Sequence, residues 1–487
     1  MSDARIGARL APPAVGTAAG SLLVVASGLA SPLVAAVGLA GLTVVALIVA
    51  FPYWGFLLTA AVVPMERIGR ITDDSSLATV SLMRIVGTLS LGALLLHALL
   101  RRKRIILSTP GLVYAGYFAL CLLTLAFTSD FEFGVRASSS IFANLLFFVL
   151  VVNSVKTPAH ARAAVICWLL TTTAVGVFTM YQWHNGSVIT DDPFASTGQR
   201  SADERYSTVL SDISEYQVLE ATPRALGTSS HPAVYAINLI LTLPFFAYFF
   251  RITRSRLWRL AIAGATAVTA YNVMLANTRA AIIAMLLVFG LIVAMRLIRL
   301  TGTALAVGAV VCLLAVPFVP SALWTRVLNV SNYTLDRSDT LRARLTYWQE
   351  ALSMLAENLP LGIGVGNQTE LPRRLSTRMY MPPNSTVHNE YLQSLLETGL
   401  LGFALLAAFM VLLYRYARRG ERLLLRHGEL HDALLFRACR IAMFSVLIYG
   451  AQVDVLHFPL KGWWLAMGIA VALYIHRPAE RPLAKAA

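Results

Sequence analysis

The sequence predicts an all-α, polytopic membrane protein. Of its 487 residues, 57% are hydrophobic and only 13% are charged, whereas a soluble domain carries roughly 25% charged residues. The apolar residues gather into runs of about 15–20 residues, a length typical of membrane-spanning helices. The strands of a membrane β-barrel would instead alternate in polarity at every second residue, and the sequence does not show this pattern.

Each predicted span corresponds to one apolar run. The stretch 12–63 is apolar throughout and holds one to three crossings, with breaks at Ser31-Pro32 and Phe51-Pro52. Clearer spans follow at 83–100, 110–127, 139–153, 163–181, 232–250, 259–275, 280–296, 302–320, 395–414, 434–450 and 461–475. We expect about 12 membrane-spanning helices, with about 14 as the alternative.

The net charge of +15 comes largely from short basic clusters between the apolar runs. These clusters lie at 101–104, 251–259, 296–299, 415–426 and after His476. Lys and Arg in short loops mark the cytoplasmic side of a membrane protein, so both termini are predicted to be cytoplasmic. This distribution indicates a membrane topology and argues against nucleic acid as a partner.

Two long segments fall on the opposite side of the membrane, at 182–231 and 321–390. Long loops are uncommon unless they are functional, so the predicted site lies on the outer face. We divide the chain into 1–231, which holds the N-terminal spans and the first loop, and 232–487, which holds the remaining spans and the second loop.

The second loop contains a predicted amphipathic helix that ends before Pro360. Leucines and a tryptophan recur at helical spacing and form one apolar stripe, made of Leu341, Leu345, Trp348, Leu352 and Leu355. Such a helix lies on the membrane surface or packs against the bundle. The following LGIGVGN has no preceding strand, so we interpret it as a flexible turn rather than a dinucleotide site.

The stretch STVHNEYLQSLLETGLLG at 385–402 begins polar and becomes apolar. Ser385 or Thr386 is the expected helix N-cap, which would put His388 in the first turn, on the same side as Tyr391. The polar residues would therefore mark the outer end of a span. Asn389 and Glu397 belong to the same polar group.

Arginines recur at the predicted outer boundary. Arg279 lies in a tight turn between two spans, where its partner is either a lipid phosphate or a substrate phosphate, and Arg224 and Arg344, with Arg342, lie in the long loops. A guanidinium group can bind two phosphate oxygens at once. Together with His388, these arginines predict a site for an anionic, lipid-anchored ligand.

Other chemistry lacks support in the sequence. It contains no Walker motif, no H-E-x-x-H and no G-x-S-x-G, and the TDD segments at 72–74 and 190–192 lack the D-x-D spacing of a metal–diphosphate site. We therefore expect no metal and no cofactor, with arginines neutralising the charge. The four cysteines, Cys121, Cys167, Cys312 and Cys439, lie in or beside apolar runs and are expected to be core residues.

Four segments in order, RALGTSSHP, ANTRAA, RLTYWQEALSMLAENLPLGIGVGN and HNEYLQSLLETGLLG, resemble the O-antigen ligase family, which also includes O-antigen and exopolysaccharide polymerases. The motifs cover roughly 224–402. One departure is Ala233 after His231-Pro232, where many members have Asn, and it leaves the fine contacts of the first loop uncertain.

The resemblance implies a GT-C-like glycosyltransferase of the bacterial inner membrane with a periplasmic site. Such an enzyme moves a glycan from undecaprenyl pyrophosphate to an acceptor, without metal and with inversion. By motif, Arg279 and Arg344 would hold the pyrophosphate, with Arg224 assisting, and His388 would activate the acceptor hydroxyl. Arg342, Asn389, Tyr391 and Glu397 would support them.

The acceptor stays open between lipid A–core, for a ligase, and a growing lipid-linked glycan, for a polymerase. Membrane lipids are the other expected partners, and the sequence gives no signal of oligomeric state. A transporter of lipid-linked glycans would need charged residues along several spans, and this chain has few: Arg84, His97 and Asp454 lie near span ends.

The predicted topology can be tested with reporter fusions. A reporter that is active only in the periplasm should be active when fused within 190–220 or 365–380, because both loops are expected outside the cytoplasm. Activity of a cytoplasmic reporter at either position would contradict this topology.

Overall fold

The computed structural model describes residues 32–65, 81–185, 225–229, 231–298, 340–367, 370–375, 387–453 and 460–477. Every regular element in these ranges is a helix, so the predicted all-α class is confirmed for the described part of the chain. The apolar run at 302–320 lies outside these ranges, and so do Cys312 and Asp454.

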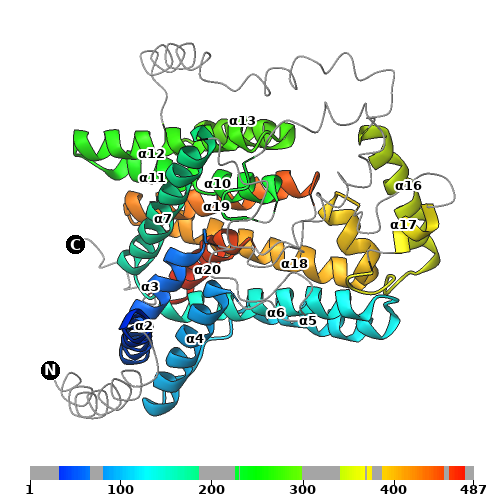
Figure 1. Ribbon diagram of the computed structural model, residues 1–487, viewed down its shortest axis with the longest axis horizontal. Coiled ribbons are helices and arrows are strands. Elements are labelled where there is room, and N and C mark those ends of the chain that lie inside the picture. Colours follow the sequence, from blue (N-terminus) through cyan, green and yellow to red (C-terminus); the bar gives the residue numbers. More distant parts are fainter. Residues whose placement is uncertain are drawn as a thin grey trace, which may run out of the picture.

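The helices follow one another as labelled in Figure 1. In chain order they are α2 (Pro32–Ala50), α3 (Pro52–Val62), α4 (Leu82–Leu100), α5 (Thr109–Thr124), the 3₁₀ turn η1 (Leu125–Phe127), α6 (Phe131–Ser154), α7 (Pro158–His184), α10 (Pro232–Ile240), α11 (Leu243–Ile252), α12 (Arg256–Leu275), α13 (Arg279–Ala294), α16 (Thr340–Glu357), α17 (Glu370–Leu375), α18 (Glu390–Arg426), α19 (Leu430–Gly450) and α20 (Lys461–Ile475).

Seven helical segments of the described chain are long and apolar enough to cross a membrane. They are Leu82–Leu100, Thr109–Phe127, Phe131–Ser154, Pro158–His184, Pro232–Ile252, Glu390–Arg426 and Leu430–Gly450. Shorter apolar helices include α3, α13 and α20. The chain is therefore a multi-pass membrane protein, while the total of about 12 spans stays a prediction.

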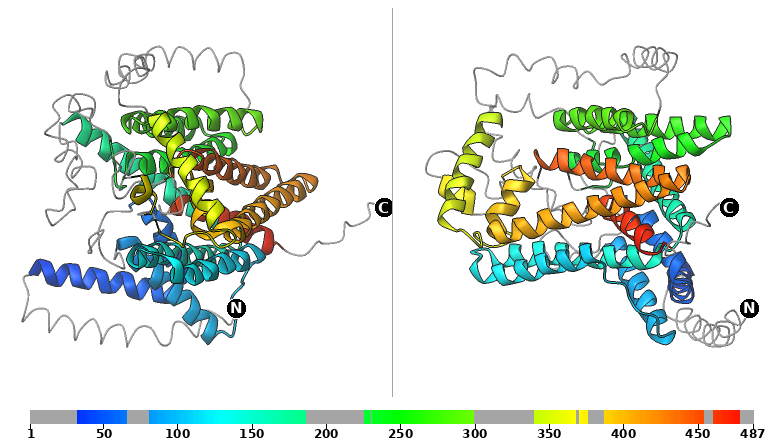
Figure 2. Two further views of the ribbon diagram at one scale, coloured as in Figure 1. Left: turned by 90° about the vertical axis from the view of Figure 1, so that its right-hand side faces the viewer. Right: turned by 180° about the vertical axis from the view of Figure 1, so that it is seen from behind.

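Most of the long helices run along the long axis of the molecule. Figures 1 and 2 show α5, α6, α12, α13, α18 and α19 roughly aligned, whereas α2 lies across them. Helices α16 and α17 cover one end of this bundle.

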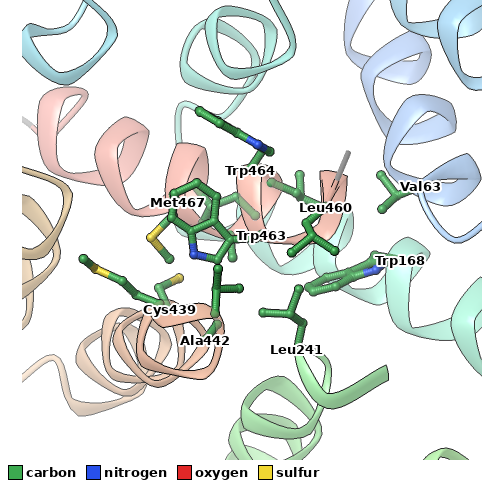
Figure 3. Close-up of a cluster of buried hydrophobic side chains, with 14 of the residues drawn as sticks. Val63, Trp168, Leu241, Cys439, Ala442, Leu460, Trp463, Trp464 and Met467 are labelled. Atoms are coloured by element: carbon green, nitrogen blue, oxygen red, sulfur yellow. The ribbon is translucent and has the colours of Figure 1, made fainter. Parts of the chain in front are cut away.

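The centre of the bundle is α20. All its residues from Gly462 to Leu473 are buried. Figure 3 shows Trp463 and Met467 beside Cys439 and Ala442 of α19, while Leu460 lies near Trp168 of α7. A methyl group on Gly462 would approach the Trp168 ring to 2.5 Å, so close packing requires the glycine. Cys121 and Cys439 are buried, as expected of core residues, whereas Cys167 is only partly buried.

The predicted span 232–250 is interrupted. It consists of α10 and α11, separated at Leu241–Thr242. Pro244 has no backbone N–H and cannot continue the hydrogen-bond ladder. The Thr242 hydroxyl donates to the Leu239 carbonyl at 2.6 Å, which satisfies a polar group that the interruption would otherwise leave buried.

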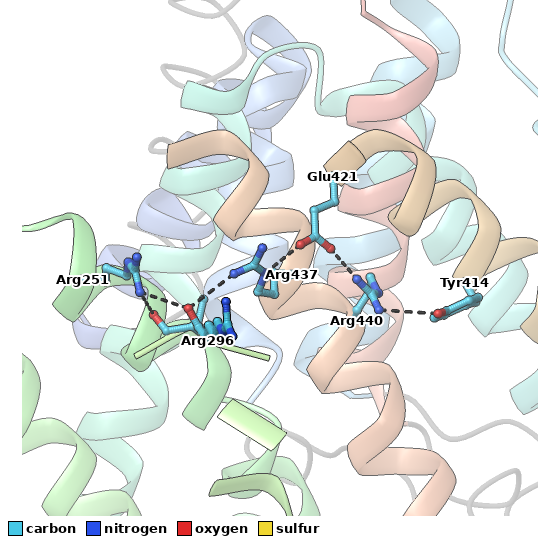
Figure 4. Close-up of polar contacts among 7 residues, drawn as sticks. Arg251, Arg296, Tyr414, Glu421, Arg437 and Arg440 are labelled. Carbon is cyan, nitrogen blue, oxygen red and sulfur yellow. Dashed lines mark hydrogen bonds and ion pairs between the residues drawn. The ribbon is translucent and has the colours of Figure 1, made fainter. Parts of the chain in front are cut away.

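A polar cluster defines what we call the basic end of the bundle (Figure 4). The buried carboxylate of Glu421 on α18 accepts from Arg437, at 2.7 Å, and from Arg440, both on α19. Arg251 at the end of α11 donates to the carbonyls of Arg296 and Leu297, at 3.0 and 3.1 Å. The ends of α11 and α13, the N-terminal half of α19 and the C-terminal half of α18 therefore meet here.

This cluster corrects one expectation. The basic segment 415–426 is not a loop but the last part of α18, which continues to Arg426. Its polar side chains pair with α19, and Tyr416 reaches Thr109 at the start of α5 at 3.4 Å. The start of α5 thus also lies at the basic end.

α18 is kinked at Gly399, which has φ 63° and ψ −167°. The kink leaves the carbonyls of Leu396 and Glu397 without their partners in the helix. The loop after α16 supplies new ones, because Ile363 N–H donates to Leu396 O at 2.9 Å and Gly364 N–H to Glu397 O at 3.0 Å. In return, Leu401 N–H donates to Pro360 O at 3.5 Å.

The segment LGIGVGN is therefore not a flexible turn. Its three glycines have φ values of 75°, 99° and 73°, in the left-handed region that favours glycine. A methyl group on Gly364 would lie 2.9 Å from backbone atoms of Thr124 and Thr128, and one on Gly366 would lie 2.7 Å from Gly134. The loop is a close-packed wedge between α18 and the turn that joins α5 to α6.

We predict that Gly399→Ala destabilises the protein strongly. The added methyl group would lie 1.9 Å from Pro360 O, and alanine would have to adopt a φ and ψ found almost only in glycine, at a cost of order 1–3 kcal/mol before any clash. Thermal unfolding in detergent measures the effect. Gly116→Ala on α5 is the control, because its methyl group meets nothing within 4 Å. Equal melting temperatures for the two variants would contradict the prediction.

Candidate functional site

The N-terminus of α18 carries the predicted base, but not as the sequence suggested. The N-cap is Asn389, whose side chain accepts from Tyr391 N at 3.1 Å and from Leu392 N at 3.2 Å, and the helix begins at Glu390. The expectation that Ser385 or Thr386 caps the helix is wrong, since Asn, like Ser and Thr, is a preferred N-cap and stands closer to the apolar run.

His388 therefore precedes the helix instead of occupying its first turn. Its φ is 52°, in the left-handed region that residues other than glycine rarely adopt. Such a conformation costs of order 1–3 kcal/mol and is found most often where function requires it. His388 is half-buried between the capped helix and the buried Val387.

The C-terminal turns of α19 lie directly beside this segment. The Tyr391 hydroxyl donates to the Leu447 carbonyl. Tyr449, two residues further on, donates to the Ala233 carbonyl in the first turn of α10 at 3.0 Å. The start of α18, the end of α19 and the start of α10 thus meet at one place, which we call the site end of the bundle.

α16 brings an arginine to the same place. The Trp348 indole N–H donates to the Val387 carbonyl at 3.0 Å, which ties α16 to the residue before His388. Arg344 lies one helical turn before Trp348, and its guanidinium is within electrostatic reach of the Tyr449 hydroxyl. Arg344 and His388 therefore flank the same end of α19.

α16 differs in one respect from the predicted stripe. Leu355 is buried and Trp348 is partly buried, but Leu345 and Leu352 are exposed. The buried face instead centres on Ala351 and Met354, which pack with residues of α17 and α18 such as Leu371 and Leu396. The helix thus packs on the bundle with one face, which is one of its two predicted roles, and presents two leucines on another. Its contact with the membrane surface stays a prediction.

α17 is tied to the end of α16 by an ion pair. Arg374 donates to Glu357 at 2.8 Å, and this hydrogen bond holds the pKa of the Glu357 carboxyl below its ordinary value. The pair is exposed, so its net contribution to stability is small. It fixes the orientation of α17 against α16.

Arg279 is the first residue of α13 and follows Asn277, which is buried with φ 47°. Because α13 ends at the basic end, where Arg296 O accepts from Arg437 at 3.4 Å, its start lies at the opposite, site end. Arg279 is exposed there. The side chains of Arg279 and Arg344 come from helices far apart in the sequence, α13 and α16, yet both belong to the same end of the bundle.

The first motif segment packs against the turn that carries Arg279. Ala225 N–H donates to the Leu275 carbonyl at 3.0 Å, at the end of α12. Gly227 has φ 54°, and a methyl group there would lie 2.2 Å from the Tyr235 ring. Arg224 lies outside the described residues, and so does the side chain of Arg342 on α16, so their predicted roles stay predictions.

Glu397 is placed differently from the other candidates. It is buried, and its carboxylate accepts from the Gln393 side chain one turn earlier. Its backbone carbonyl accepts from Gly364 N. Glu397 thus belongs to the kink and the glycine loop, where it supports the shape of α18 instead of facing the site end.

Sequence reasoning missed several polar residues that build this end of the bundle. Tyr449 and Trp348 make the hydrogen bonds that join α10, α16, α18 and α19. Away from this end, the ammonium group of Lys461 at the start of α20 donates to the Asn144 side chain of α6. A lysine and an asparagine inside apolar runs were the available signals, because buried polar groups need partners.

Comparison with known proteins agrees with the motifs. Residues 264–407 match the family model described as O-antigen ligase, a segment that runs from α12 through α13 and α16 to the middle of α18. No curated protein matches the chain. Arg279, Arg344 and His388 all lie within the matched segment. Residues 264–407, which hold all three of these side chains, are therefore similar to the O-antigen ligase family.

Proposed function

We propose that the protein transfers a glycan from undecaprenyl pyrophosphate to an acceptor sugar, lipid A–core, at the periplasmic membrane face, with inversion and without a metal. The match of residues 264–407 to the O-antigen ligase family, whose members are ligase- and polymerase-type membrane glycosyltransferases, supports the general reaction. The donor, the acceptor and the roles of individual residues are our inference from the geometry of the site end.

The observation that carries the proposal is the separation of charge along the bundle. The site end collects Arg279, Arg344 and His388, whereas the carboxylate of Glu421 and its arginine partners lie at the basic end. If the basic end faces the cytoplasm, the site end faces the periplasm. A lipid-linked donor and a lipid-linked acceptor would both already lie at that interface.

The proposed reaction uses each side chain for one task. His388 accepts the proton of the acceptor hydroxyl, whose oxygen attacks the anomeric carbon from the side opposite the pyrophosphate. The glycosidic bond forms as the bond to the pyrophosphate oxygen breaks, which inverts the anomeric centre. Arg279 and Arg344 stabilise the negative charge that collects on the departing pyrophosphate, and Arg224 and Arg342 are proposed to assist.

The two arginines suit a pyrophosphate for a chemical reason. The planar guanidinium group offers several N–H donors in a fixed arrangement and can bind two phosphate oxygens at once. Such groups can neutralise the leaving group without a divalent cation. This is the basis for proposing that the reaction is independent of metal.

A repeat-unit polymerase of the same family is the second candidate. Its donor and its chemistry would be the same, and only the acceptor, a second lipid-linked glycan, would differ. The glycan profile of a deletion strain separates the two. Loss of O-antigen with intact lipid-linked polymer identifies a ligase, whereas single-repeat caps or loss of exopolysaccharide identifies a polymerase.

A transporter of lipid-linked glycans is disfavoured by the distribution of charged residues. The arginines and the histidine of the site lie at one end of the bundle, and the buried residues of α20 from Gly462 to Leu473 are apolar or aromatic. A path for a polar glycan would need polar residues along its length.

We predict that Arg279→Lys and Arg344→Lys each lower transfer at least about tenfold, although both keep the charge. Lysine cannot bind two phosphate oxygens at once, and a hydrogen bond to a charged group contributes ~1.5–3 kcal/mol. Transfer in purified membranes measures the effect. The control is Arg256→Lys, because Arg256 begins α12 and Arg279 follows the other end of that helix. Full activity in both test variants would indicate that Arg279 and Arg344 contact lipid head groups only.

We predict that His388→Ala lowers turnover by about 10²–10⁴-fold, the usual size of general-base catalysis. His388→Gln should not restore activity, because an amide can hydrogen-bond a hydroxyl but cannot accept its proton. The wild-type rate should rise with pH through the range in which histidine loses its proton, about pH 5–8. Expression should change little, because Asn389 caps the helix.

The decisive measurement for His388 is transfer by wild type, Ala and Gln variants across about pH 5–9. An active Gln variant with a flat pH profile would remove His388 as the base. The histidine would then position the acceptor, and the arginines would be the main catalytic groups.

A further inference from the structure

An apolar groove lies between α4, α5 and α6, away from the site end. Its volume is about 280 Å³, and its wall includes Leu91 and Leu95 of α4, Ile105, Leu112 of α5, and Phe148 and Val152 of α6. Ser108 is the one polar side chain in the wall, and its hydroxyl oxygen already accepts from Gly111 N at 3.2 Å. Leu95 and Leu112 are about half exposed, so the groove opens on the surface of the bundle.

A basic segment stands at one end of this groove. Arg101, Arg102, Lys103 and Arg104 are all exposed, and the next residue, Ile105, lines the groove. The sequence has no Asp or Glu between 81 and 129. None of the ion pairs formed among the described residues involves this segment.

The backbone at Arg102 has a conformation that glycine adopts more readily than arginine. Arg102 has φ 50°, and the Lys103 N–H donates to the Ala98 carbonyl at 2.8 Å, which is the Schellman arrangement that ends many helices. Glycine is the usual residue at the left-handed position of this motif. Arg102 takes this position here, and Arg296 takes it in the same arrangement at the end of α13, where Leu297 N–H donates to the Ile292 carbonyl at 2.9 Å.

The groove and the basic segment are held in fixed relation. Asn153, buried near the end of α6, accepts from Ile106 N at 2.8 Å and donates to Ile106 O at 3.1 Å. These two bonds tie the connection between α4 and α5 to α6. The backbone that carries the four basic residues is therefore held in place beside the apolar wall.

We propose that this surface binds one anionic phospholipid of the cytoplasmic leaflet, with an acyl chain in the groove and the phosphate at Arg101–Arg104. An apolar groove that adjoins a cluster of unneutralised cations matches a molecule with an apolar chain and an anionic head. The groove volume of about 280 Å³ lies just below the range of small-molecule pockets, about 300–1,000 Å³, so the groove takes no more than one chain. Basic segments beside spans recruit anionic lipids electrostatically.

The site is independent of the proposed glycan transfer, because it lies at the basic end with the start of α5. Native mass spectrometry tests it directly. The full-length protein, purified in mild detergent, is titrated with phosphatidylglycerol and with phosphatidylcholine of the same acyl chains. We expect one phosphatidylglycerol molecule to stay bound under conditions that remove phosphatidylcholine.

Two pairs of variants separate the head-group contact from the groove. The double variant Arg101→Gln/Arg104→Gln should weaken phosphatidylglycerol binding roughly 10- to 30-fold. The control double variant Arg254→Gln/Arg256→Gln removes the same amount of exposed charge where α11 is joined to α12. It should not weaken binding. Ala115→Leu, which fills the groove, should abolish the retained lipid. Ala119→Leu makes the same change one turn further along α5, outside the groove, and should leave the retained lipid in place.

Other outcomes would overturn the proposal. Equal effects of the two charge pairs would indicate a general attraction to anionic membranes, and equal effects of the two leucine variants would indicate that the groove holds no chain. A dimer that Ala115→Leu dissociates would show that a second copy fills the groove. Melting temperatures measured without added lipid identify a variant that fails to fold, and Ala115→Ile then replaces Ala115→Leu.

Discussion

Every backbone N–H and C=O inside a membrane must find a partner within the protein, and at Gly399 α18 cannot meet this requirement alone. The kink leaves the carbonyls of Leu396 and Glu397 and the N–H of Leu401 without helical partners, and the loop at 360–364 supplies all three. An unsatisfied buried backbone group costs several kcal/mol in this setting. The kink and the loop therefore require each other.

This exchange determines where the candidate site residues lie. The loop is the continuation of α16, so docking it at Gly399 fixes α16 against the N-terminal part of α18. Trp348 then reaches the Val387 carbonyl, and Arg344 comes to the end of α19 near Tyr449. The distance between an arginine of one segment and a histidine of another is thus set by main-chain hydrogen bonds, which few substitutions can alter.

The sequence was sufficient to predict those features that depend on composition and on the spacing of apolar residues. Hydropathy located most spans, and the helix at 340–357 followed from apolar spacing, because burial dominates in both cases. Features that depend on one side chain or one φ angle were missed. Asn389 and Ser385 are equally good caps in isolation, so the sequence does not decide between them. The sequence likewise does not show whether a glycine inside an apolar run, such as Gly399, kinks its helix.

The central helix α20 has a consequence for how the protein responds to its membrane. Its 15 residues rise only about 22 Å at 1.5 Å per residue, less than the roughly 30 Å of a bilayer core. Because its residues from Gly462 to Leu473 are buried, lipid tails do not reach it, and hydrophobic mismatch acts instead on outer helices such as α12 and α13, with their exposed leucines. A change of bilayer thickness would therefore tilt the outer helices and leave the position of α20 within the bundle unchanged.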